Sequence, residues 1–182
     1  AEVGKKFIES SQKFAYQDKF EYGALIEISR LRERIEKELA KEATKGKNVK
    51  LGYGGIADIE FAVQILQLMH GNKFARLRET NILVALKNFV ALGLVDQSMA
   101  EELQGSYLFL RNLECVLRIS RQTSTNILPK ENKELAPVAR LIGYEGEDVQ
   151  TLSEALLTDY DLHTQRVRKH YRKTIGNLLR AH

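Results

Sequence analysis

The sequence predicts an all-α fold, a bundle of about six or seven helices. Hydrophobic residues recur at steps of three and four along most of the chain, as in helices that bury one face. No strand-like alternation of polar and apolar residues lasts five positions, and only two prolines interrupt the 182 residues. Since proline breaks the interior of a helix, its scarcity leaves room for long helices.

The N-terminal third is expected to hold two helices and a loop. Val3, Phe7 and Phe14 lie roughly on one side of a first helix, Glu2 to Lys13. The segment ATKGKNVKLGYGG predicts a loop, with a short extended piece at Val49 to Leu51. Between them a second helix is expected, with the apolar stripe Leu25, Ile28, Leu31, Ile35 and Leu39.

The middle of the chain predicts two helices with end signals. A third helix is expected from Asp58 to about His70, and Gly71 would end it in a left-handed cap. Thr80 can cap a fourth helix, which Gly93 would stop.

Three further helices are expected in the C-terminal half. A long fifth helix opens at Asp96 or Ser98. A short helix spans 135–142 if Pro137 falls in its first turn, where proline is tolerated. A last helix, from 148 to about 179, would be about 45 Å long at the rise of an α-helix.

Composition narrows the class of protein. No apolar run approaches the roughly 20 residues of a membrane helix, and the first residues lack the apolar core of a signal peptide. Cys115 is the only cysteine, so we expect a reducing cytoplasm, and its apolar neighbours predict a buried thiol. A net charge of +4 with both signs mixed is far from a cationic nucleic-acid arm. We expect neither a membrane nor a nucleic acid as partner.

The stretch KLGYGGIADIEF, residues 50–61, holds the candidate site residues Lys50, Gly54, Gly55, Asp58 and Glu60. Its two acids copy the acid-x-acid spacing of nucleotidyltransferase metal sites, where a strand places both carboxylates on one side. Here the helical period continues, so the two side chains point about 200° apart. We therefore expect no metal ligand and no catalytic residue in this chain.

Two other interpretations of the stretch stay open. As a helix start, Asp58 is the N-cap, Glu60 suits the helix dipole, and Gly54 and Gly55 allow a sharp turn. As a phosphate or nucleotide contact, the glycine turn offers free amides and Lys50 adds charge, although both carboxylates oppose an anion. The helix start explains most of the pattern, but not why Lys50 accompanies the glycines.

Four segments carry a resemblance to a known family: KLGYGGIADIEFAVQILQLMHG, LRETNILVALKNFVALGLV, SYLFLRNLECVLRISRQTSTNILP and ELAPVARLIGY. Together they resemble the glutamine synthetase adenylyltransferase/adenylyl-removing enzymes, and the resemblance covers nearly the whole chain. Three positions depart from the family pattern. Ala57 stands where arginine is usual, Asn126 where histidine is common, and Gln17 where arginine is frequent.

The resemblance implies a helical domain that follows a polymerase-β-like nucleotidyltransferase domain. Residues 1–22 would be a linker or first helix joining that upstream domain, and residues 23–182 the helical bundle domain. Magnesium, ATP and the catalytic carboxylates would belong to the upstream domain, so this chain is expected to be inactive alone. The implied partners are that domain, glutamine synthetase and the nitrogen signal protein. The implied reactions are AMP transfer to a tyrosine of glutamine synthetase and its phosphorolytic removal.

The resemblance also implies roles for the candidate residues. The turn would face the catalytic cleft, where Lys50 meets a phosphate and Gly54 and Gly55 let backbones approach. Asp58 and Glu60 would fix the turn, or Asp58 would pair with a basic residue of the upstream domain. Two alternatives remain, a self-contained helical interaction module and the helical domain of a signal-protein uridylyltransferase.

Overall fold

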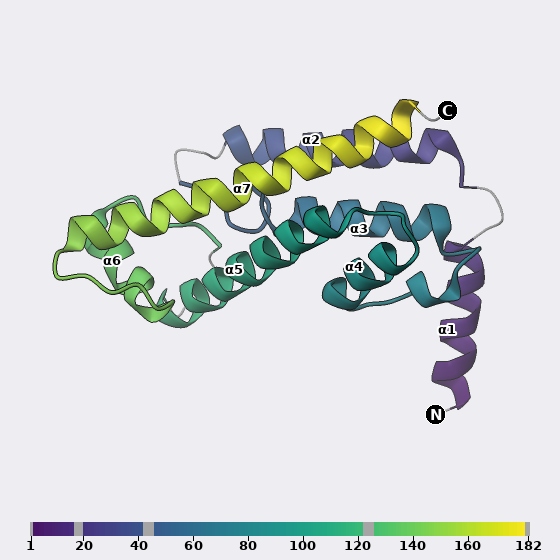
Figure 1. Ribbon diagram of the computed structural model, residues 1–182, viewed down its shortest axis with the longest axis horizontal. Coiled ribbons are helices and arrows are strands. Elements are labelled where there is room, and N and C mark those ends of the chain that lie inside the picture. The colour runs from purple at the N-terminus through teal and green to yellow at the C-terminus, as the bar shows by residue number, and fades with distance from the viewer. Residues whose placement is uncertain (1, 17–19, 42–45, 122–125, 181–182) are drawn as a thin grey trace.

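The structure, a computed structural model, describes residues 2–16, 20–41, 46–121 and 126–180 (Figure 1). These residues form seven α-helices and a short 3₁₀ turn, and they contain no strand, so the all-α prediction is confirmed. The helices are α1 (Glu2–Ala15), α2 (Tyr22–Lys41), α3 (Ile56–His70), α4 (Ile82–Ala91), α5 (Gln97–Arg121), α6 (Asn132–Leu141) and α7 (Val149–Arg180). The 3₁₀ turn, η2, is Ala75–Leu77.

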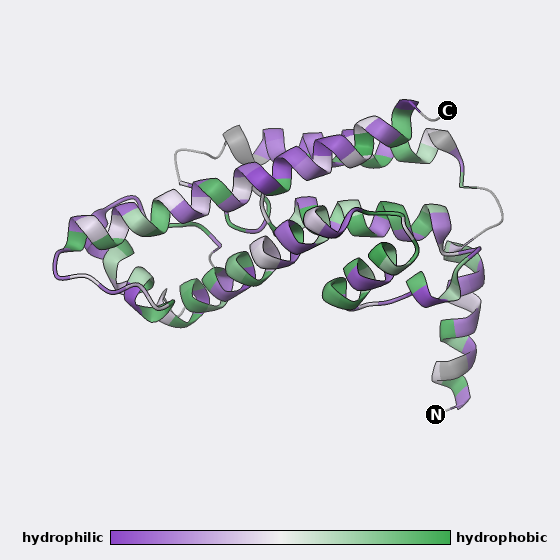
Figure 2. Ribbon diagram, in the orientation of Figure 1, coloured by the Kyte–Doolittle hydropathy of each residue, from purple (hydrophilic) through white to green (hydrophobic). Residues whose placement is uncertain are grey.

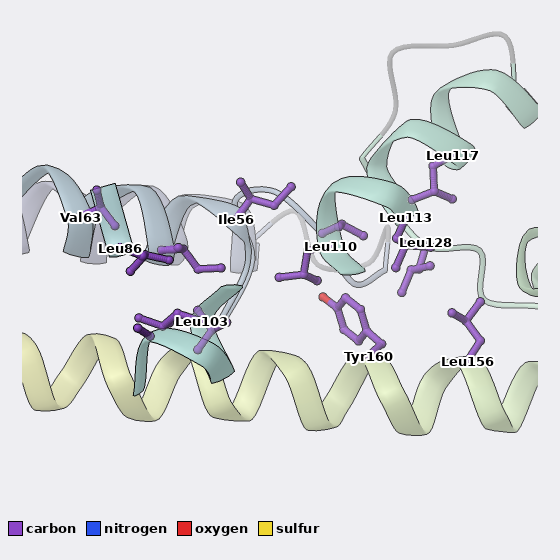
Figure 3. Packing of buried hydrophobic residues seen from close by; sticks show 14 of the residues in the cluster. Ile56, Val63, Leu86, Leu103, Leu110, Leu113, Leu117, Leu128, Leu156 and Tyr160 are labelled. Carbon is purple, nitrogen blue, oxygen red and sulfur yellow. The ribbon is translucent and has the colours of Figure 1, made fainter. Parts of the chain in front are cut away.

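The last helix, α7, organises the bundle. It is the longest element, and α3, α5 and α6 all pack along it, while α4 packs on α5 (Figure 1). Hydrophobic and hydrophilic residues alternate around the turns of α5 and α7 (Figure 2). In the main core, Leu110, Leu113 and Leu117 of α5 lie beside Leu156 and Tyr160 of α7 (Figure 3). The predicted amphipathic periodicity therefore buries one face of each long helix.

A second, smaller core attaches α2 to the bundle. Its members are Leu25 of α2, Ala62 and Ile65 of α3, and Tyr171 and Ile175 of α7. Among the described side chains, the predicted stripe of α2 is wrong at Leu31, which is 48% exposed, whereas Arg32 is fully buried. The side chain of Leu39, the last member of the predicted stripe, lies outside the described residues. Arg32 follows Leu25 and Ile28 at steps of three and four, so the buried stripe passes through a charged residue.

Three predicted helix ends differ from the structure. The N-cap of α3 is Gly55, so Asp58 lies inside the first turn and is not the N-cap. Gly71 has a right-handed conformation, with φ −67°, in place of the predicted left-handed cap. A Cβ at Gly71 would lie 2.5 Å from the Tyr16 ring, so glycine is required there by a close contact. The cap of α4 is Asn81, whose side chain accepts from two backbone amides, and not Thr80.

Of the other local predictions, the end of α4 is confirmed, and those for Pro137, residues 49–51 and Cys115 are wrong. Gly93 ends α4 with φ +67°, as expected. Pro137 lies inside α6 and not in its first turn, because α6 begins earlier than predicted. Residues 49–51 form a turn, and the only bridge of the described chain pairs Asn48 with Ile127. Cys115 is exposed, so the predicted buried thiol is wrong.

None of the described helices is both long enough and apolar enough to cross a membrane.

Candidate functional site

The turn before α3 is held by its own backbone and one asparagine. The Asn48 side chain accepts from the amides of Lys50 and Leu51, at 3.0 and 2.8 Å. The Gly52 amide donates to the Asn48 carbonyl, and the Gly55 amide donates to the Gly52 carbonyl. The turn is anchored further by the Val49 amide, which donates to the Asn126 carbonyl at 2.8 Å. It is thus a compact, internally bonded unit.

Gly54 and Gly55 are required by close backbone contacts. Gly54 has φ +63°, and a Cβ there would lie 1.9 Å from the Thr164 carbonyl oxygen of α7. A Cβ at Gly55 would lie 2.7 Å from the Lys50 carbonyl oxygen. The close approach that these glycines permit is therefore between parts of this chain, and it seats the turn on α7.

The first amides of α3 are bonded within the turn. The Ile56, Ala57 and Asp58 amides donate to the carbonyls of Val49, Lys50 and Gly55, at 2.9 to 3.1 Å. The Gly54 amide donates to Asp58 Oδ2 at 3.1 Å. An anion at this helix start would find these backbone donors already occupied, so a phosphate contact here depends on the Lys50 side chain.

Asp58 is the centre of a buried cluster of four charged side chains. Its carboxylate is fully buried, with Oδ1 2.6 Å from Arg32 Nε and Oδ2 3.1 Å from Arg168 Nη1. Glu36 completes the cluster, with Oε2 2.9 Å from Arg168 Nη1. The partners of Asp58 therefore lie in α2 and α7 of this chain. We call Arg32, Glu36, Asp58 and Arg168 the buried charge cluster.

The buried charge cluster is electrically balanced, and it is also hydrogen-bonded to the turn. Two arginines face two carboxylates, which is how charged groups are tolerated in a core. Arg32 Nη2 donates to the Gly52 carbonyl at 2.9 Å, so α2 bonds directly to the glycine turn. Burial alone would lower the pKa of Arg168, but Asp58 and Glu36 raise it above its ordinary value. Burial and Asp58 raise the pKa of the neighbouring Tyr171.

The side chains of Lys50 and Glu60 have different surroundings from that of Asp58. Lys50 is half-buried, and its ammonium has no ion-pair partner among the described residues. Glu60 is also half-buried and lies near enough to Tyr107 of α5 to act on it electrostatically. Asp58 and Glu60 thus have different surroundings, as expected for neighbours two apart on a helix.

Tyr53, at the tip of the turn, is 47% exposed. Its ring lies 5.1 Å from the guanidinium carbon of Arg168 and 6.0 Å from that of Arg172. The turn therefore presents Lys50 and an arginine-flanked tyrosine.

Three members of the buried charge cluster, Arg32, Glu36 and Arg168, were not among the predicted site residues. Arg32 carried a signal, since it continues the stripe of Leu25 and Ile28 at helical steps. Arg168 carried none, because it sits in the basic run RVRKHYRK, most of which reads as a solvated face.

The departures from the family pattern have definite places. Ala57 is buried, so the side chain at this position lies inside the structure. Asn126 meets the turn through its carbonyl. Gln17 lies outside the described residues.

Comparison with known proteins identifies the family. The GlnD PII-uridylyltransferase family matches residues 27–175. The chain is 34% identical over 145 residues to the bifunctional glutamine synthetase adenylyltransferase/adenylyl-removing enzyme of Hahella chejuensis, covering 80% of this chain and 15% of that enzyme. It is 34% identical over 157 residues to the enzyme of that name from Rhizobium meliloti, covering 85% of the chain and 16% of the enzyme.

A third relative aligns over almost the full chain. The Bartonella quintana enzyme of the same name is 31% identical over 177 residues, covering 96% of the chain and 18% of the enzyme. The chain thus spans between 15% and 18% of the length of these three relatives. It belongs to the family described as GlnD PII-uridylyltransferase, and it is homologous to one region of the bifunctional glutamine synthetase adenylyltransferase/adenylyl-removing enzymes.

Proposed function

We propose that the chain is the helical domain of a bifunctional glutamine synthetase adenylyltransferase/adenylyl-removing enzyme. The observation that carries the proposal is the alignment, which takes in up to 96% of this chain but no more than 18% of such an enzyme. The nucleotidyltransferase chemistry, with its ATP and magnesium, then belongs to another region of the parent polypeptide. Residues 1–22 connect to that region, and residues 23–182 form the helical unit that supports it.

The proposed setting of the domain follows from the same relatives, whose name states that they act on glutamine synthetase. Glutamine synthetase is the substrate protein, the nitrogen signal protein is the regulator, and the compartment is the cytoplasm. AMP is transferred to a glutamine synthetase tyrosine or removed from it by phosphorolysis.

The proposed contribution of the glycine turn is to hold Lys50 beside the nucleotidyltransferase site. Three features support this role. Backbone amides of the turn are bonded internally, Gly54 sits against α7, and the Lys50 ammonium has no ion-pair partner among the described residues. Asp58 acts indirectly, because it fixes the turn through Gly54 and the two arginines. A half-buried lysine on an internally bonded turn suits a phosphate of the nucleotide.

A charge reversal in the full-length parent enzyme tests this role. Lys50→Glu should lower AMP turnover at least about tenfold, equivalent to about 1.4 kcal/mol of transition-state stabilisation, with an unchanged thermal midpoint. Lys87→Glu is the matched control, because Lys87 is exposed on α4, and it should leave turnover unchanged. Turnover is measured as adenylylated glutamine synthetase by mass spectrometry. Normal turnover in Lys50→Glu would remove Lys50 from the site.

A second candidate function is the helical domain of a signal-protein uridylyltransferase. The family match over residues 27–175 favours it, because that family is described as a PII-uridylyltransferase. The parent enzyme, given ATP and UTP with glutamine synthetase and the PII protein together, separates the two. We expect AMP on glutamine synthetase, whereas UMP on the PII protein would establish the second candidate.

A further inference from the structure

A row of polar residues on α5 forms no part of the buried charge cluster. Of residues 50–61, Glu60 acts electrostatically on the first member of this row, Tyr107. Tyr107, Arg111, Glu114 and Arg118 recur at steps of four, three and four, so they lie on one face of the helix. We call these four residues the α5 polar stripe.

Glu114 is the buried centre of the α5 polar stripe. Its side chain is 3% exposed, whereas those of Arg111 and Arg118 are 48% and 49% exposed. Arg111 Nη1 donates to Glu114 Oε2 at 2.6 Å, and Arg118 Nη2 donates to Glu114 Oε1 at 2.9 Å. One carboxylate therefore binds the guanidinium groups of two arginines whose Cα atoms lie about two helical turns apart.

The charges of this trio do not balance. One carboxylate neutralises one guanidinium, so a second arginine is not needed to make the burial of Glu114 tolerable. Among the described residues, Glu114 is the only hydrogen-bond partner of either arginine side chain, and neither forms an ion pair with Glu60. Each guanidinium carries five N–H donors, so several face solvent unused. The α5 polar stripe thus carries one excess positive charge, and Glu114 orients the guanidinium groups of both arginines.

We propose that Arg111 and Arg118 form a binding site for a phosphate group, with Glu114 as the positioning residue. Guanidinium forks match the oxygens of phosphate in a bidentate way, and a tetrahedral phosphate offers enough acceptors for both forks at once. Glu114 holds the arginine heads together before the ligand arrives, which reduces the loss of side-chain entropy on binding. The phosphate group is either inorganic phosphate or part of a nucleotide.

This site is a property of the 182-residue chain and goes beyond the proposed function. Failure of the phosphate titration below would leave the role of Lys50 untouched. Failure of the Lys50→Glu experiment would likewise leave the phosphate site untouched.

The site is tested by NMR on the 182-residue chain with ¹⁵N-labelled arginine side chains. Inorganic phosphate is added at constant ionic strength, with sodium chloride making up the difference. The Nε–Hε signals of Arg111 and Arg118 should shift together and saturate. The double variant Arg111→Gln/Arg118→Gln should weaken the apparent affinity at least about tenfold, the loss expected for removing charged bidentate contacts. Arg140→Gln, which alters an exposed arginine of α6, should bind as the natural chain does.

Two additional measurements identify the ligand and replace a variant that does not fold. Tighter binding of AMP than of inorganic phosphate would assign the site to a nucleotide, and the reverse would assign it to free phosphate. If the double variant fails to fold by circular dichroism, Arg111→Lys/Arg118→Lys replaces it. That variant keeps both charges and loses the forks, so it should still bind more weakly. Saturation by acetate as tight as by phosphate, or undiminished phosphate binding in the folded double variant, would overturn the proposal.

Discussion

At the scale of single residues, two glycines of this molecule have opposite surroundings. Gly54 has a positive φ and lies where any Cβ would collide with the Thr164 carbonyl. Gly105 lies within α5, is exposed, and has open space around the position of a Cβ. The same change to alanine is therefore expected to have opposite effects at the two positions.

Gly54→Ala should lower the free energy of unfolding by at least about 2 kcal/mol, because it adds left-handed strain to a contact that needs backbone movement. Gly105→Ala, the matched control, should raise it by about 0.5–1 kcal/mol, since alanine is the better helix former. Urea unfolding followed by circular dichroism measures both. A neutral Gly54→Ala would mean that the turn does not sit against α7 as described.

At the scale of elements, the attachment of α2 rests on a small apolar patch and on the buried charge cluster. Leu25 supplies the buried apolar contact of α2, and Arg32 reaches both Asp58 and the Gly52 carbonyl. Breaking a buried ion pair leaves its remaining charges without compensation, which costs more than the pair itself contributes. The position of α2 and the conformation of the turn are therefore coupled through one carboxylate.

Asp58→Ala tests this coupling, because it leaves Arg32 and Arg168 facing each other with only Glu36 between them. It should cost about 3–5 kcal/mol of unfolding free energy. Asp161→Ala is the control, since Asp161 lies inside α7 and forms an exposed pair with Lys47, so its loss should cost less than about 1 kcal/mol. Hydrogen exchange should show faster exchange in α2 of the Asp58 variant. Equal stability of the two variants would contradict a structural role for the cluster.

At the scale of the whole molecule, stability depends on the long interface of α5 with α7, and that interface contains a titratable ring. His163 of α7 stacks on Phe109 of α5 with ring centroids 4.3 Å apart, and its Nδ1 is 3.0 Å from Ser106 Oγ. Burial, with help from Arg166, lowers the pKa of His163 below its ordinary value. Burial and Lys73 lower the pKa of His70 in the same direction.

These shifts fix the sign of the pH dependence. The folded chain holds both histidines neutral more strongly than the unfolded chain does, so the unfolded chain binds protons first as the pH falls below about 6.5. The free energy of unfolding should therefore be highest above pH 7. It should decline as the pH falls below about 6.5 toward the lowered pKa values of His163 and His70. His163→Gln should reduce this slope without abolishing it, because His70 remains. A natural chain that gains stability between pH 7 and pH 5 would contradict the description of this interface.

The sequence by itself determined which seven segments are helical, because the spacing of apolar residues along a helix is a property of that segment alone. It also carried the resemblance to the family, and the glycines and acids of residues 50–61 pointed to the turn. Only the tertiary structure decided that Asp58 is a buried ionic centre and not an N-cap, and that the amides of the turn are occupied. The reason is distance along the chain: Asp58 meets Arg168 across 110 positions, and the helical period of either segment says nothing about which charges the fold brings together.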